Sequence, residues 1–61
     1  MDIHYRDTGL GFSYTITAQS GGVVAYGERD TLAECKKAVR DHLFSLAIRT
    51  GRRPETTVRY L

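Results

Sequence analysis

Two side chains in this sequence have the types of a nucleophile and a general base. Cys35 and His42 are seven residues apart in a segment that favours a helix, and this spacing brings both to the same side of it. Seven residues also separate them by about 10.5 Å along the helix axis, roughly three times the reach of a hydrogen bond. A direct catalytic pair is therefore excluded if the helix is continuous. We expect Cys35 to be a small buried hydrophobic residue and His42 to lie at the edge of the core.

Three further patterns resemble parts of known functional sites, but each lacks something that such a site requires. Asp7-Thr8-Gly9 is the active-site tripeptide of aspartic proteases, but 61 residues are too few for their substrate groove and flap, so we interpret it as a hairpin turn. Gly9-Leu10-Gly11 lacks the lysine and the directly following helix of a phosphate-binding loop. One cysteine and two distant histidines do not complete a zinc site. We therefore predict no catalytic residues, no metal site, no cofactor and no enzymatic activity.

Basic residues gather in the second half of the chain. Residues 1–30 contain two arginines and four acidic residues, whereas residues 31–61 contain seven basic and three acidic residues. Arg49, Arg52 and Arg53 stand near the end of the predicted helix, where positive charge also suits the helix dipole. These three arginines either solvate the helix end or bind a phosphate or an acidic protein surface.

Phe44 and Ile48 are the most informative apolar residues. They lie one helical turn apart, on a side of the predicted helix where a monomer should place polar residues. Either the segment after Pro54 or a second protein chain should cover them. We assign partner binding to Phe44, Ile48 and the three arginines 49, 52 and 53.

The helix that positions these residues is predicted from about residue 31 to residue 50. Thr31 and Glu34 have the spacing of a capping box, Gly51 can adopt a left-handed conformation, and Pro54 prevents the helix from resuming. An apolar stripe should cover the sheet; it consists of Leu32, Cys35, Val39, Leu43 and Leu46, flanked by His42 and Ala47.

Four segments have the composition or alternation of strands. Residues 12–18 alternate strictly between large or apolar side chains and small hydroxyls. Residues 3–6, 23–28 and 56–61 are the other three, and glycine-containing turns separate the first three strands. The predicted order is β-β-β-α-β, an α+β fold with a mainly antiparallel sheet and one helix on one face. The predicted core is Ile3 or Tyr5, Phe12, Tyr14, Ile16, Leu32, Val39, Leu43, Leu46 and Val58.

Length and composition agree with one small globular domain spanning residues 1–61. Hydrophobic residues make up 41% and charged residues 26% of the chain. No apolar run approaches the roughly 18 to 20 residues that span a bilayer, and the first residues lack the pattern of a signal peptide. We therefore expect a cytoplasmic protein with no membrane contact.

The element order and the helix entry resemble the N-terminal domain of HicB-like antitoxins. The resemblance rests on Gly27 and on the run Thr31-Leu32-Ala33-Glu34-Cys35-Lys36-Lys37-Ala38, where that family has a Gly followed by Thr-x-x-Glu-Ala-x-x-x-Ala. The sequence departs from this pattern in the turn before residue 23, in two extra residues between Gly27 and Thr31, and at Cys35. The resemblance implies a binding module that covers the RNA-cleaving site of a toxin and often self-associates. The DNA-binding domain that this family usually adds, and its autorepressor role, are not expected here.

Two functional classes follow. The first is a small non-catalytic protein-binding regulator, antitoxin-like or inhibitor-like, that forms a homodimer in a prokaryote or its phage. The alternative is a small DNA-binding accessory protein, because the order of three strands and a helix is similar to the arm-type DNA-binding domain of integrases. Such domains need basic or amide side chains on a sheet face, and Arg6, Arg29 and Arg59 are the only strand-associated arginines. Protein binding is therefore the first hypothesis.

Overall fold

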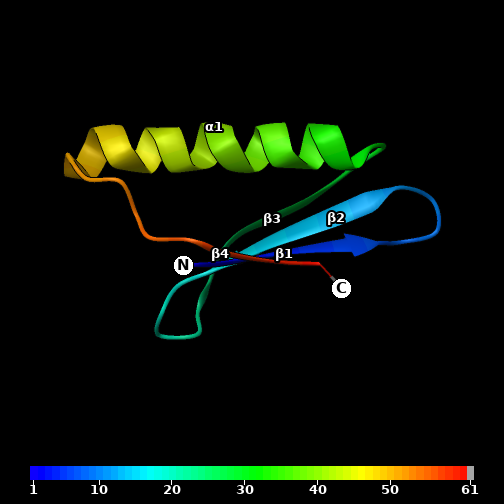
Figure 1. The fold of residues 1–61 in the computed structure, drawn as a ribbon, viewed down its shortest axis with the longest axis horizontal. Helices are drawn as coiled ribbons and strands as arrows, with labels where there is room; N and C mark the ends of the chain where they lie inside the picture. The colour runs from blue at the N-terminus through cyan, green and yellow to red at the C-terminus, as the bar shows by residue number, and fades with distance from the viewer. Residues whose placement is uncertain (61) are drawn as a thin grey trace.

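A computed structural model describes residues 1–60 and has the predicted α+β fold (Figure 1). One helix lies on one face of a four-stranded sheet whose strand order is β3-β2-β1-β4. The elements are β1 (Asp2–Asp7), β2 (Phe12–Thr17), β3 (Val23–Arg29), α1 (Leu32–Thr50) and β4 (Thr57–Tyr60). No helix within residues 1–60 is long and apolar enough to cross a membrane.

The sheet is mixed, because β4 pairs with β1 in parallel while the other two pairings are antiparallel. The direction of β4 follows from the path of the chain. Helix α1 has 19 residues and carries the chain about 28 Å back to the end of the sheet where β1 begins. The N–H of Thr57 donates there to the carbonyl of Met1 at 2.9 Å. Leu61, which the sequence placed at the end of this strand, lies outside the described residues.

Two glycine turns connect the antiparallel strands as predicted. In the first, the carboxylate of Asp7 accepts a hydrogen bond of 2.8 Å from the N–H of Gly9, whose φ is +86°. In the second, the N–H of Ala18 donates to the carbonyl of Gly22 at 2.7 Å, and Gly21 has a φ of +96°. Both positive φ values lie where a side chain would be strained. The sequence Asp7-Thr8-Gly9 is thus part of a turn.

The helix begins and ends where its sequence signals predict. The side-chain oxygen of Thr31, the N-cap, accepts a hydrogen bond of 3.2 Å from the N–H of Glu34. Gly51 has a φ of 69°, and its N–H donates to the carbonyl of Ala47 at 2.8 Å. Both ends therefore satisfy backbone groups that a helix leaves unpaired.

The core lies between α1 and the sheet and is smaller than predicted. Its buried members are Ile3, Tyr5, Tyr14, Ile16, Cys35 and Val39. Phe12, Leu32 and Leu43 of the predicted core are only partly buried against it. Leu46, also predicted in the core, is partly buried as well but is not among the residues packed against the cluster. Val58 is 46% exposed, so its predicted place in the core is wrong. The reason is the position of α1, which packs mainly on β2 and β3 and leaves β4 uncovered.

Candidate functional site

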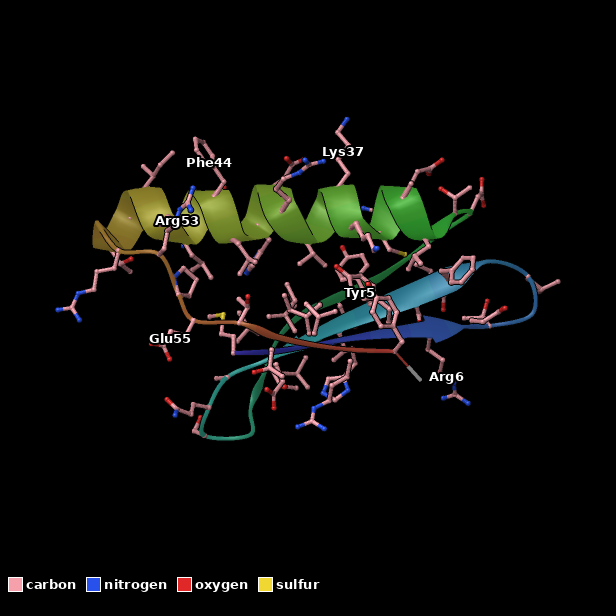
Figure 2. The ribbon with its side chains drawn as sticks, in the orientation of Figure 1. Tyr5, Arg6, Lys37, Phe44, Arg53 and Glu55 are labelled. Atoms are coloured by element: carbon pink, nitrogen blue, oxygen red, sulfur yellow. The ribbon has the colours of Figure 1, made fainter. Side chains whose placement is uncertain are left out.

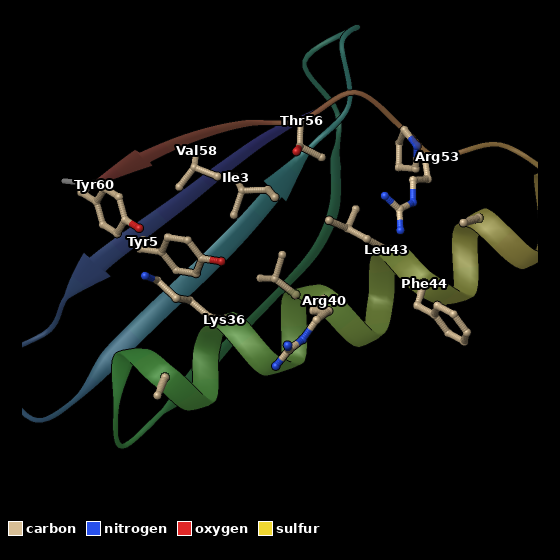
Figure 3. A pocket seen from close by; sticks show the side chains of 14 residues that line it. Ile3, Tyr5, Lys36, Arg40, Leu43, Phe44, Arg53, Thr56, Val58 and Tyr60 are labelled. Atoms are coloured by element: carbon tan, nitrogen blue, oxygen red, sulfur yellow. The ribbon is translucent and has the colours of Figure 1, made fainter.

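A groove of about 850 Å³ lies between α1 and the half of the sheet formed by β1 and β4 (Figure 3). Its apolar lining comes from Ile3 and Val58 on the sheet and from Val39 and Leu43 on the helix. The first two are paired in the parallel register of β1 and β4, so their side chains lie on the same face. Ile3 and Val39 are almost completely buried, at 2% and 3% exposure. The open part of the apolar lining is therefore Val58, which is 46% exposed, with the half-buried Leu43 beside it.

Aromatic rings and one lysine close the end of the groove nearest the start of α1. The rings of Tyr5 and Tyr60 stack with their centroids 5.6 Å apart, and the two planes differ by 27°. The ammonium group of Lys36 lies 5.4 Å from the centre of the Tyr60 ring. Burial raises the pKa of the Tyr5 hydroxyl above its usual 10.0, and neighbouring Tyr60 and Cys35 raise this pKa further. At this end, Lys36 of α1 therefore contacts Tyr60 of β4 through its side chain.

Every charged side chain that lines the groove is a cation. Lys36 and Arg40 project from α1, and Arg53 lies on the segment that leads from the helix to β4. No acidic side chain among residues 1–60 takes part in the lining. An apolar lining with three cationic groups at its margins suits an apolar ligand that carries negative charge.

The structure brings two of the five predicted partner-binding residues into this groove. Phe44 and Arg53 line it, and Phe44 is 66% exposed. Ile48 is 68% exposed one turn after Phe44, farther around the helix. Arg52 is exposed outside the lining, and the helical spacing places Arg49 on the side of α1 opposite Phe44. The segment after Pro54 therefore leaves both Phe44 and Ile48 largely uncovered.

Sequence reasoning missed Lys36, Arg40 and Tyr60 as groove residues. Lys36 and Arg40 are four residues apart and share one side of α1, which was a signal available in the sequence. Tyr60 could be assigned only once β4 was known to lie beside β1 with Tyr60 paired to Tyr5. The missing information was the long-range pairing, which no local pattern contains.

The structure offers no support for a catalytic role of Cys35 and His42. Cys35 belongs to α1, and its free thiol is completely buried. The buried Nε2 of His42 has no hydrogen-bond partner within residues 1–60. Among the same residues, no group of three or more His, Cys, Asp or Glu side chains could hold a metal ion.

The opposite face of the sheet carries balanced charge. Strand alternation places Arg6 and Arg59 on this face together with Asp2 and Glu28. Figure 2 shows Arg6 extending on the side of the sheet away from α1. Tyr26 is 79% exposed on the same face, where its strand pairs it with Thr15. Two arginines opposed by two carboxylates give this face no clear excess of positive charge.

No family model, curated protein or solved structure matches this chain.

Proposed function

We propose that this protein is a small non-catalytic regulator that acts by binding another protein, in the manner of an antitoxin or an enzyme inhibitor. The observation that carries the proposal is the open apolar groove, at whose margin Phe44 is 66% exposed. Exposed aromatic side chains beside an apolar pocket are typical of surfaces at which a partner protein binds. The resemblance of the helix entry to HicB-like antitoxins supports the same class and a prokaryotic or phage origin.

The proposal includes a cytoplasmic location and self-association. The sequence has one cysteine, which is buried and unpaired, so no disulfide supports the fold. A homodimer would cover apolar side chains that the monomer exposes, and Ile48 on the outer side of α1 is the first of these.

Site-specific photo-crosslinking tests the proposal in the native cell. A photoreactive phenylalanine analogue at Phe44 should capture a protein partner, because this side chain stands at the groove. The same analogue at Tyr26 is the matched control, since Tyr26 is also an exposed aromatic residue but lies on the opposite face of the sheet. Equal capture at both positions, or capture of nucleic acid alone at both, would contradict a protein-binding groove.

DNA binding is the competing outcome, and salt dependence separates it from protein binding. Replacing Arg49, Arg52 and Arg53 by alanine should weaken a DNA binder on any sequence and make its salt dependence shallower. A protein binder should lose affinity for one partner only, and chiefly through Arg53, since this is the one of the three that lines the groove. The balanced charge of the uncovered sheet face favours the protein-binding outcome.

A further inference from the structure

Helix α1 covers only part of the four-stranded sheet. Adjacent strands lie about 4.8 Å apart and a helix is about 10 Å wide, so one helix covers about two strands. Helix α1 packs mainly on β2 and β3, and the groove lies above β1 and β4. A second helix above these two strands would lie about 9.6 Å from α1, within the usual 8 to 10 Å between packed helices. The inward side chains of β1, Ile3 and Tyr5, are already buried, whereas Val58 and Tyr60 on β4 are exposed. A second helix beside α1 would therefore rest mainly on β4.

The charges of the groove predict which flanking residues a bound helix should have. Lys36 and Arg40 stand one turn apart on the side of α1 that faces the groove, and Arg53 stands near its other end. A helix lying beside α1 would place its own flanking side chains next to these cations. Acidic flanking residues would be attracted and basic ones repelled, because no carboxylate side chain among residues 1–60 lines the groove to offset the cations.

We propose that the groove binds an amphipathic helix of another protein, with its apolar stripe on Leu43, Val58 and Tyr60 and with acidic residues beside Lys36, Arg40 and Arg53. This inference rests on the proposed function, because it names the chemistry of the partner of the same site. Lys36 then leaves the Tyr60 ring and turns toward a carboxylate of the bound helix. Phe44, which also lines the groove, would contact the flank of the bound helix.

A second copy of this chain fits the groove less well than an acidic helix does. Two grooves facing each other across a two-fold axis would bring like charges together, since the same patch meets itself in such an interface. The helix of a second copy, residues 32–50, contains two lysines and two arginines against two acidic residues, so it is not the acidic helix that the groove selects. Strand addition at the exposed edge of β4 would leave the apolar lining uncovered.

Selection from displayed peptide libraries on the immobilised full chain tests the inference. One library has peptides of about 18 residues with leucines at helical spacing and with flanks randomised among Glu, Gln and Lys. A second library has the same composition in an alternating strand pattern, and a peptide of residues 32–50 represents a second copy. We expect enrichment of the helical library alone, with Glu preferred on its flanks.

Charge reversal locates the binding site. The Lys36→Glu and Arg40→Glu variants should each weaken the best acidic peptide about tenfold and shift the selected flanks toward Lys. Lys37→Glu is the matched control, because it makes the same charge change on a side chain that points away from the sheet (Figure 2). This control should change the affinity less than about twofold. Circular dichroism of each variant shows that α1 is retained.

Each other outcome overturns the inference. Selected peptides whose flanks show no preference for Glu would refute the role of the cations. If Lys37→Glu lost as much affinity for the acidic peptide as Lys36→Glu does, the effect would be one of overall charge and not of the groove. Enrichment of the strand library would show that the partner binds as an extended strand and not as a helix. Preference for the peptide of residues 32–50 would show that the groove binds a second copy of this chain. If Phe44 still captures a protein by photo-crosslinking, the proposed function stands while this inference fails.

Discussion

The packing of the core requires a glycine at position 27, because the ring of Tyr14 occupies the space that a side chain would fill. The backbone of Gly27 lies in β3 opposite Tyr14, and a Cβ at this position would stand 2.6 Å from the hydroxyl of Tyr14 and 2.8 Å from its ring. The ring of Tyr14 is thus laid across the backbone of Gly27 beneath α1. The resemblance to HicB-like domains included this glycine, and the structure supplies a packing reason for it that is independent of any partner.

The Gly27→Ala variant should be destabilised because the ring of Tyr14 must leave its place in the core. We expect a loss of about 1–3 kcal/mol in the free energy of unfolding, measured by urea denaturation. Gly22→Ala is the control, since a Cβ there would meet nothing within 4 Å and its φ is not positive. Gly22→Ala should keep the wild-type stability or exceed it. Equal stabilities of the two variants would contradict this packing role.

Tyr5 should make the protein less stable at alkaline pH. Burial raises its pKa in the folded state above the usual 10.0, so the folded state favours the protonated hydroxyl. The stabilising contribution is complete below the unfolded-state pKa of about 10 and is lost as the pH rises through the higher folded-state pKa. Urea denaturation at pH values from about 9 to about 11 should show a decline that is shallower in Tyr5→Phe. An unchanged slope in this variant would remove Tyr5 as the cause.

At the scale of elements, the helix boundary depends on one hydroxyl. The hydroxyl of Thr31 accepts a hydrogen bond from the N–H of Glu34. Thr31→Ala removes this bond and should lower the free energy of unfolding by about 1 kcal/mol. Ser45→Ala is the control, because Ser45 is exposed inside the same helix, where alanine is at least as favourable. The two variants should move the melting temperature in opposite directions or leave Ser45→Ala unchanged. Loss of stability in both would show that the helix is sensitive to any polar-to-alanine change.

The helix, the three meander strands and both turns could be predicted because their signals are local. Thr31 and Gly51 mark the ends of α1 within a few residues of the groups they bind, and Phe12 begins a strict alternation. The parallel placement of β4 depends on contacts between residues that are 50 or more positions apart in the sequence, such as the hydrogen bond from the N–H of Thr57 to the carbonyl of Met1. The exposure of Val58 and the formation of the groove beside Phe44 follow from that placement. The sequence therefore predicted that Phe44 is uncovered but could not predict the groove that it borders.

At the scale of the whole molecule, one helix on four strands leaves apolar surface on two sides of α1. The groove uses Phe44 at its margin, whereas Ile48 points farther from the sheet by about 40° of helical rotation. A partner in the groove would therefore leave Ile48 exposed. A second copy that packs along the outer side of α1 could cover Ile48 while the groove remains open to another protein.

Self-association through Ile48 is the prediction at this scale. Light scattering over a dilution series should show the molar mass rising toward that of a dimer at roughly millimolar concentration, where a Kd of about 1 mM is detectable. Ile48→Lys should shift the equilibrium to the monomer, because the long stem of lysine can lie on apolar surface while its charge reaches water and opposes pairing. Leu10→Lys is the control, since Leu10 is 98% exposed at the far hairpin. A wild type that stays monomeric throughout the series would rule out the homodimer and leave Ile48 free for a different protein, while an equal effect of Leu10→Lys would show that added charge, rather than the loss of Ile48, separates the copies.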